Sequence, residues 1–251
     1  MKYIGIDIGS TASKVVITEN DIRNFFVLPT GWNSKLTAEI IKKKLENLSP
    51  TIMSESKIVA TGYGRISVNY ADKVVTEISC HGKGGYELAK SDCTIIDIGG
   101  QDTKLINVKN GRTVDFLMND KCAAGTGKFI EVMADRLALT IDELFELAKH
   151  GTAIPISSLC TVFAESEVIN YMGEGKPKED LAAGVIDSVA NKVVNLMQRK
   201  TLQDTIIITG GLSHNTYFSE LLSKKLKTKV ISQSNGRYAG ALGASIIAKS
   251  L

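Results

Sequence analysis

Two short segments of the chain repeat the same residue types ninety positions apart. In each, an aspartate near the end of an apolar run is followed by glycine, then by small, hydroxylic or amide residues, and then by a lysine. A glycine turn lets the backbone approach a ligand closely, and successive amide groups around such a turn form a concavity that binds anions. The neighbouring aspartate can orient Mg²⁺ or its waters, because hard cations take oxygen ligands. The candidate residues are Asp7, Gly9, Ser10, Thr11, Ala12 and Lys14 in the first segment and Asp97, Gly99, Gly100, Gln101 and Asp102 in the second, which continues to Lys104.

Two such turns facing each other would clamp the phosphates of a nucleotide from both sides. A third glycine element, Gly210-Gly211, follows the apolar run 205–209 and would let a flat base or ribose approach the backbone. One glycine turn alone is weak evidence, but three elements in this order predict an ATP site. We expect the carboxylates and the amide of the turns to serve catalysis and the remaining turn residues to bind the nucleotide. The expected catalytic residues are Asp7, Asp97, Gln101 and Asp102.

Other phosphate-binding loops do not fit the sequence. A Walker A loop ending at Gly127-Lys128 would need glycine at position 122 and a hydroxyl at 129, where the chain has Cys122 and Phe129. No GxGxxG pattern follows a predicted strand, so a Rossmann fingerprint is absent as well.

Two of the four cysteines stand before helical patterns, among small and hydroxylic residues. Cys122 lies in the segment 119–129 and Cys160 in the segment 158–167. A helix N-terminus offers unpaired amide groups and the positive end of the helix dipole, which lower the pKa of a thiol and favour an anionic iron–sulfur cluster. Two cysteines are half of the thiolates that a four-iron cluster usually needs, and a symmetric dimer would supply the other two.

The other two cysteines are expected to serve packing. Cys93 opens a predicted apolar strand, and an unpaired cysteine is usually a small buried hydrophobe. The same interpretation is favoured for Cys80, although Cys80-His81 beside Gly82 could line a cleft. A metal site built from all four cysteines of one chain is the rival hypothesis.

Strands and helices alternate along the chain, which predicts the α/β class. Besides the two hairpins, strands are expected near 25–28, 57–60, 73–77, 114–118, 205–209 and 229–232. Helices are expected near 34–48, 80–90, from 215 and from 238, and 126–200 is mainly helical with a break around 151–158. The repeated hairpin predicts two lobes, residues 1–92 and 93–251, with the last helix able to pack back on the first lobe.

Composition excludes several classes of protein. The 251 residues are 43% hydrophobic and 23% charged, an ordinary globular balance, and the net charge of +3 is too small for a dedicated nucleic-acid binder. The longest nearly uncharged apolar run, 239–248, is too short to span a bilayer, and no signal-peptide pattern opens the chain. A cytoplasmic protein without nucleic-acid or membrane partners is expected.

The two phosphate segments and Gly210-Gly211 resemble the phosphate and adenosine motifs of the superfamily that contains actin, Hsp70 and the sugar kinases. That resemblance implies a duplicated, ribonuclease H-like ATPase fold with two lobes around a nucleotide cleft. The cysteine segments add Asn-Asp-Lys-Cys-Ala-Ala-Gly-Thr-Gly from Asn119 and Cys-Thr-Val-Phe-Ala-Glu-Ser-Glu from Cys160. With them, the chain from Tyr3 to Ala248 closely resembles the BadF/BadG/BcrA/BcrD ATPase family, which includes the activators of 2-hydroxyacyl-CoA dehydratases.

The resemblance implies a homodimer that shares one [4Fe–4S] cluster, ligated by Cys122 and Cys160 of each subunit. It also implies that MgATP drives a low-potential electron from this cluster to a partner iron–sulfur enzyme such as a 2-hydroxyacyl-CoA dehydratase. Reduced flavodoxin or ferredoxin would supply the electron. Gly125-Thr126-Gly127 resembles a phosphate-contacting loop of related kinases and would couple nucleotide state to the helix after Cys122.

Alternatives stay open on the residues alone. A benzoyl-CoA reductase or a double-cubane iron–sulfur protein would use a similar electron donor. A small-molecule kinase of the same superfamily could use Asp102 as a base for phosphoryl transfer, although the chain has little room for a sugar-specificity insertion. A nucleotide-gated scaffold without catalysis is a third class. Measuring the iron content would distinguish the kinase and the scaffold from the electron donor, because only the electron donor carries a cluster.

Overall fold

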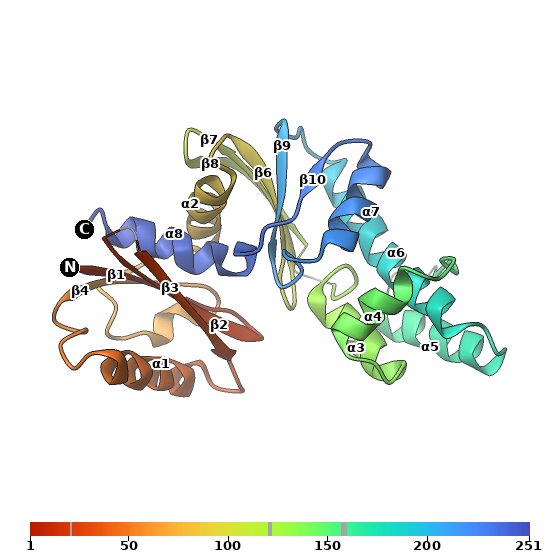
Figure 1. Ribbon diagram of the computed structural model, residues 1–251, viewed down its shortest axis with the longest axis horizontal. Coiled ribbons are helices and arrows are strands. Elements are labelled where there is room, and N and C mark those ends of the chain that lie inside the picture. The colour runs from red at the N-terminus through yellow and green to blue at the C-terminus, as the bar shows by residue number, and fades with distance from the viewer. Residues whose placement is uncertain (21, 120–121, 157–159) are drawn as a thin grey trace.

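Two five-stranded sheets form the centre of the molecule in the computed structural model, which describes residues 1–20, 22–119, 122–156 and 160–251. The strand order is β3-β2-β1-β4-β5 in the first sheet and β10-β9-β6-β7-β8 in the second. Figure 1 shows the two sheets at opposite sides of a pair of crossing helices. The expected α/β class with a duplicated core is therefore confirmed.

The first sheet begins with an antiparallel hairpin. β1, β2 and β3 form this meander, and β4 and β5 add parallel strands beside β1. The helix α1 follows β3. It begins after Asn33, whose side chain accepts hydrogen bonds from the amides of Lys35 and Leu36. The bounds are β1 Lys2–Ile8, β2 Ala12–Glu19, β3 Ile22–Pro29, α1 Ser34–Leu48, β4 Ser56–Thr61, η1 Arg65–Ser67 and β5 Lys73–Val74.

The second sheet repeats this plan. β6, β7 and β8 form an antiparallel meander, and β9 and β10 run parallel to β6. The bounds are β6 Cys93–Ile98, β7 Thr103–Lys109, β8 Arg112–Asn119, β9 Thr205–Gly210 and β10 Val230–Ile231.

The two hairpins have the same strand register, and the same type of backbone hydrogen bond closes their turns. Asp7 pairs with Lys14 across the first hairpin and Asp97 with Lys104 across the second. The amide of the turn glycine donates to the carbonyl three residues on in both, at 3.2 Å in the first and 2.9 Å in the second. The sequence repeat is thus a structural repeat.

The second lobe carries a helical layer built around one long buried helix. α3 Gly127–Arg136, α4 Ile141–Ala148, α5 Thr161–Gly173 and α7 Thr216–Leu226 all pack against α6 Lys178–Met197. The prediction of a single break in 126–200 was wrong, because two more breaks separate these helices. Ala138 adopts a left-handed φ of 51° before the capping box of Thr140, and Gly175 adopts a φ of 74° just before Pro177.

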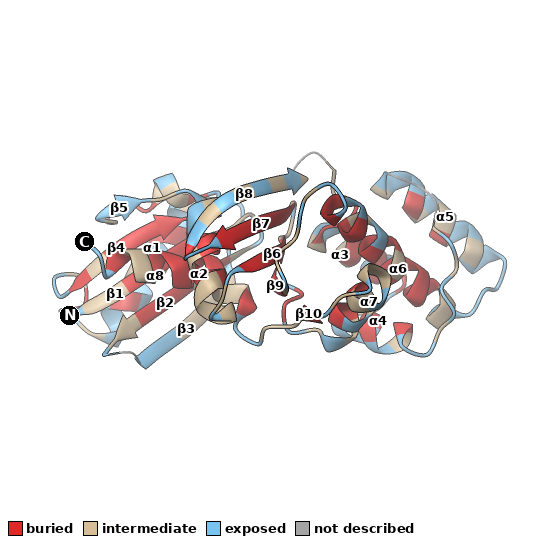
Figure 2. Ribbon diagram, turned by 90° about the horizontal axis from the view of Figure 1, so that it is seen from above, coloured by how far each residue is buried: buried red, intermediate tan, exposed pale blue. Residues whose placement is uncertain are grey.

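Two helices join the lobes. α2 Glu77–Ala89 packs on the second sheet, and α8 Ala239–Ala248, which follows the short η2 Gly236–Tyr238, packs on the first. The strand expected at 73–77 was wrong at its end, because Thr76 caps α2 and helix begins at Glu77. The helix expected to close residues 1–92 therefore packs against the sheet of the other lobe. The last helix packs back on the first lobe (Figure 2).

Glycines permit the close crossing of α2 and α8. A Cβ on Gly84 would overlap the Ala239 carbonyl, and one on Gly243 would overlap the Cys80 carbonyl. Within the described residues, none of the helices combines the length and apolar character needed to cross a membrane.

Substituting Gly243→Ala should destabilise the fold by about 3 kcal/mol, because the added methyl group meets backbone that cannot rotate away. Denaturant unfolding would measure the loss. The matched control is Gly173→Ala at the end of α5, where a Cβ meets nothing within 4 Å. There the free energy of unfolding should change by less than about 1 kcal/mol. Equal effects of the two substitutions would contradict close packing at the crossing.

Candidate functional site

The two hairpin turns face each other across the lobes. A Cβ on Gly100 of the second turn would overlap the Thr11 hydroxyl of the first and lie 3.4 Å from Ser10 Oγ. The folded chain therefore brings together the two segments that the sequence places ninety residues apart.

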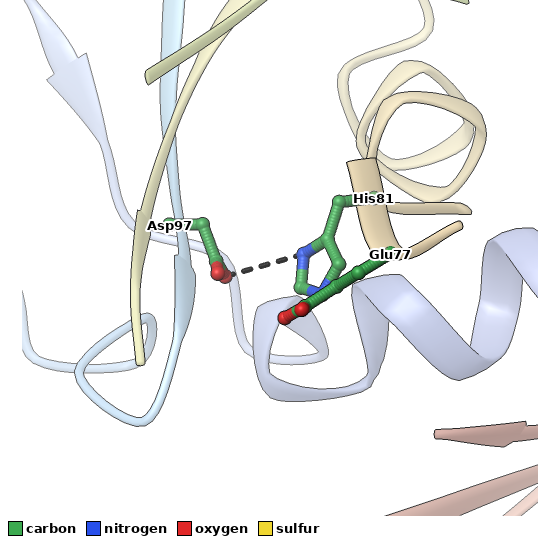
Figure 3. Close-up of side chains that lie close together, drawn as sticks. All are labelled: Glu77, His81 and Asp97. Atoms are coloured by element: carbon green, nitrogen blue, oxygen red, sulfur yellow. Dashed lines mark ion pairs between the residues drawn. The ribbon is translucent and has the colours of Figure 1, made fainter. Parts of the chain in front are cut away.

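Asp97 is buried and surrounded by donors. His81 Nδ1 lies 3.3 Å from Asp97 Oδ1, and the Thr209 hydroxyl donates to the same oxygen at 2.7 Å. Lys104 Nζ lies 3.5 Å from Oδ2. Burial opposes the charge, but the nearby His81 imidazole, the Lys104 ammonium and the Thr209 hydrogen bond outweigh it and hold the pKa of Asp97 well below its usual range. Figure 3 shows His81 reaching from α2 toward Asp97 on β6.

The Lys104 ammonium is buried among carboxylates. It lies 2.6 Å from Asp102 Oδ1 and 3.0 Å from Glu77 Oε1, in addition to Asp97. Glu77, His81 and Asp97 have the donor types and proximity of a metal site. However, the Lys104 cation already pairs with two of these three residues, and the surrounding carboxylates keep its pKa raised despite burial. We conclude that this cluster is held together by the ammonium ion.

Asp7, the equivalent of Asp97, has a different environment. Its Oδ1 is buried and has no hydrogen-bond partner within the described part of the chain, and its Oδ2 lies 4.0 Å from His81 Nε2. Burial raises the pKa of Asp7, whereas Lys14 and His81 act in the opposite direction. An orphaned carboxylate oxygen beside a phosphate-type turn fits a ligand to Mg²⁺ or to one of its waters.

The third glycine element lies at the end of β9. Gly210 adopts a φ of 83°, and the Gly211 amide donates to the Ile98 carbonyl at 3.1 Å. A Cβ on Gly211 would meet nothing within 4 Å, so there is open space beside this backbone. β4 ends in the same way, with Gly62 at a φ of 85° after Thr61, a correspondence that the sequence analysis missed.

The second turn is bonded directly to the start of α3. The Gly127 amide donates to the Gly99 carbonyl at 2.9 Å, and the Lys128 amide donates to the Gly100 carbonyl at 2.8 Å. The Thr126 hydroxyl lies 3.2 Å from the same Gly100 oxygen. Gly125, at a φ of 90°, accepts from the Thr103 hydroxyl at 2.7 Å. The predicted loop 125–127 therefore contacts the phosphate turn through its backbone.

Cys122 and Cys160 precede helices that pack together, α3 and α5. Cys160 is exposed and directly precedes α5, and the buried hydroxyl of Thr161 beside it has no hydrogen-bond partner among the described residues. Cys122 is half-buried and four residues separate it from α3, so it stands farther from its helix than expected. Residues 120–121 and 157–159 of the two predicted segments lie outside the described part of the chain.

The remaining cysteines are packing residues, as expected. Cys80 and Cys93 are buried in two separate apolar clusters, and burial raises the pKa of each thiol to about 12. Their burial in two different clusters argues against a site made from all four cysteines of one chain.

Four side chains of the site were missed or underrated by the sequence analysis: Glu77, His81, Lys104 and Thr209. Glu77 and His81 are four residues apart on one face of α2, a signal that was lost because the helix was expected to begin at 80. Lys104 lies in the repeat itself, but the pattern did not show that it would be buried.

Comparison with known proteins identifies relatives along the whole chain. The BadF/BadG/BcrA/BcrD ATPase family matches residues 4–248. The chain is 44% identical to the activator of lactoyl-CoA dehydratase from Anaerotignum propionicum, over 99% of this chain and 97% of the relative.

Solved structures agree with this family. Component A of the (R)-2-hydroxyglutaryl-CoA dehydratase of Acidaminococcus fermentans superposes with a TM-score of 0.92 at 39% identity, covering 100% of this chain and 98% of that one. The activator of the 2-hydroxyisocaproyl-CoA dehydratase from Clostridium difficile, solved with bound ADPNP, gives 0.90 at 38% identity, covering 100% and 95%. A glucokinase from Streptomyces griseus, at 13% identity and a TM-score of 0.63, shares the fold, covering 100% of both chains. The expected actin- and sugar-kinase-like fold is confirmed.

Replacing Lys104 with methionine should destabilise the protein by about 3 kcal/mol, because three carboxylates lose their shared cation. The lowered pKa of Asp97 stabilises the fold above the ordinary carboxyl pKa, so the loss should shrink as the pH falls below about 4. Urea unfolding at several pH values would measure it.

The control is Lys42→Met, which breaks an exposed pair with Glu46 on α1. That substitution should cost less than about 1 kcal/mol. If Lys104→Met were equally mild at neutral pH, the ammonium would not be what holds the cluster.

Proposed function

Because the chain belongs to the BadF/BadG/BcrA/BcrD ATPase family, we propose that it is an ATP-dependent electron donor. It couples the binding and hydrolysis of MgATP to the delivery of single low-potential electrons to an iron–sulfur enzyme. A 2-hydroxyacyl-CoA dehydratase is the proposed acceptor, since relatives that match nearly the full chain are named as activators of such enzymes. The observation that carries the proposal is the backbone connection between the phosphate turn at Gly99 and the segment of Cys122.

The nucleotide would lie between the two hairpin turns. The first turn supplies Ser10 and Thr11 and the second supplies the amides from Gly99 onward, so that amide and hydroxyl donors face the phosphates from both lobes. The orphaned Oδ1 of Asp7 would meet Mg²⁺ or one of its waters. Gln101, which is exposed, would orient the attacking water. The remaining proposed contacts are Gly9, Ala12, Lys14, Gly100, Asp97, Asp102, Gly125, Thr126, Gly127, Gly210 and Gly211.

Cys122 and Cys160 would hold one [4Fe–4S] cluster together with the same residues of a second subunit. The fit rests on the exposed thiol of Cys160 at a helix start and on the orphaned Thr161 hydroxyl, which can donate to a cluster sulfur. When bound, the cluster supplies a one-electron carrier. Within one subunit, Cys80 and Cys93 are buried elsewhere, so the two missing thiolates must come from another chain.

The surface beside Cys160 suits a homodimer. Val162 and Phe163 follow the cysteine on α5 and are 65% and 66% exposed. Large apolar side chains with this exposure next to a metal ligand are typical of a subunit interface. Reduced flavodoxin or ferredoxin is the proposed electron source.

Anaerobically purified protein should contain about four irons and four acid-labile sulfides per dimer. Cys122→Ser and Cys160→Ser should each abolish this content, because each removes two of four ligands from the shared site. Iron and sulfide analysis with visible spectra would measure it. Cys93→Ala, the control, removes a buried thiol and should leave the iron content unchanged. A colourless protein that hydrolyses ATP and refuses reconstitution would contradict the proposal and favour a kinase.

Gly127→Ala should uncouple the cluster from the nucleotide. A Cβ there would lie 3.1 Å from the Gly99 carbonyl oxygen and push α3 away from the phosphate turn. Because Gly127 is itself a proposed nucleotide contact, the native protein and the variant are compared at saturating MgATP. The rate at which a chelator removes iron should no longer respond to MgATP. A native response in this variant would exclude coupling through residues 125–127.

A further inference from the structure

His81 and Gly240 occupy equivalent places on the two crossing helices. Gly84 of α2 and Gly243 of α8 each approach the backbone of the other helix, and this reciprocal contact marks the centre of the crossing. His81 lies three residues before the first glycine and Gly240 three residues before the second. His81 faces Asp97 of the second lobe, and Gly240 lies against Asp7 of the first. The duplicated fold therefore offers two helix positions for the two aspartates, but only one of them carries a side chain.

The single imidazole serves both aspartates. Its Nδ1 lies 3.3 Å from Asp97 Oδ1, and its Nε2 lies 4.0 Å from Asp7 Oδ2 and 3.8 Å from Glu77 Oε1. The ring is buried, with 6% of the side chain exposed. Nδ1 makes no hydrogen bond of good geometry within the described residues, so close contacts with three carboxylates, at ion-pair distances, set the orientation of the ring.

Glycine at position 240 allows the His81 imidazole to approach Asp7 as well as Asp97. A Cβ there would lie 2.7 Å from Asp7 Oδ2 and 2.7 Å from His81 Nε2, closer than real contacts allow. Any side chain at 240 would thus separate the imidazole from Asp7. Oδ2 faces the imidazole, whereas no described residue makes a hydrogen bond to Oδ1 of the same carboxylate.

We infer that His81 is a positioning residue shared by the two lobes. Its Nδ1 holds Asp97, and its Nε2 orients Asp7 so that Oδ1 is the oxygen presented to the divalent cation of the bound nucleotide. The inference rests on the nucleotide site of the proposed function and does not depend on the cysteines. A purely electrostatic role of His81 predicts the opposite result. A positive imidazole near Asp7 would repel a divalent cation, so removing the imidazole would then tighten cation binding.

The test measures Mn²⁺ binding by electron paramagnetic resonance in the complex of the full-length protein with ADP. His81→Asn retains an amide donor near the position of Nδ1 but nothing at Nε2. Gly240→Ala retains the imidazole but inserts a methyl group that must push it and the Asp7 carboxylate apart. Both variants should bind Mn²⁺ at least tenfold more weakly, while ADP affinity in the presence of a chelator stays within about threefold. Gly173→Ala, whose Cβ enters open space, should bind both as the native protein does.

Unchanged or tighter Mn²⁺ binding in a folded His81→Asn protein would overturn the inference. So would a loss of ADP affinity equal to the loss of Mn²⁺ affinity, because that would show general damage to the site. If His81→Asn does not fold, Gly240→Ala decides by the same criteria. Failure of the native protein to bind ADP at all would instead refute the proposed nucleotide site.

Discussion

Two backbone hydrogen bonds connect the phosphate turn of the second lobe to the first turn of α3. The Gly127 amide donates to the Gly99 carbonyl, and the Lys128 amide donates to the Gly100 carbonyl. They involve no side chain, so the distance between the turn and the helix cannot change without breaking them. A movement of the turn that accompanies binding or loss of the γ-phosphate must therefore be followed by α3 or must break two backbone hydrogen bonds. α3 packs against α5, and this contact extends the connection from the Cys122 segment to Cys160.

The two lobes share the same sheet and hairpin, and the residues of the site are where the two copies differ. Both hairpins pair an aspartate with a lysine, yet Lys104 is buried in contact with Asp97 and Asp102, whereas one oxygen of Asp7 has no hydrogen-bond partner among the described residues. The carboxylates of the second hairpin are thereby held by an ammonium ion, and those of the first are not. The second lobe alone inserts the helices α3 to α6 between its meander and β9, and both cysteine segments lie in this insertion.

Much of this could be predicted from local pattern. The two hairpins, the glycine elements and the cysteines before helices all depend on residues close in sequence, and the structure has the hairpins and helices near their expected bounds. The crossing of α2 and α8 could not be predicted, because it depends on glycines that are 159 positions apart in sequence and have no local signature. The role of Lys104 was hidden for a similar reason. A lysine in a strand usually faces water, and its burial is tolerable here because Glu77 from α2 joins Asp97 and Asp102 around the ammonium.

Coupling between the nucleotide and the cysteines is the central claim, and the cluster potential tests it most directly. The measurement is the midpoint potential of the anaerobic dimer, followed by electron paramagnetic resonance, without nucleotide, with MgADP and with a non-hydrolysable ATP analogue. The account predicts that the analogue lowers the potential by at least about 60 mV relative to MgADP, which is a tenfold change in the one-electron equilibrium. Equal potentials in all three states would contradict it.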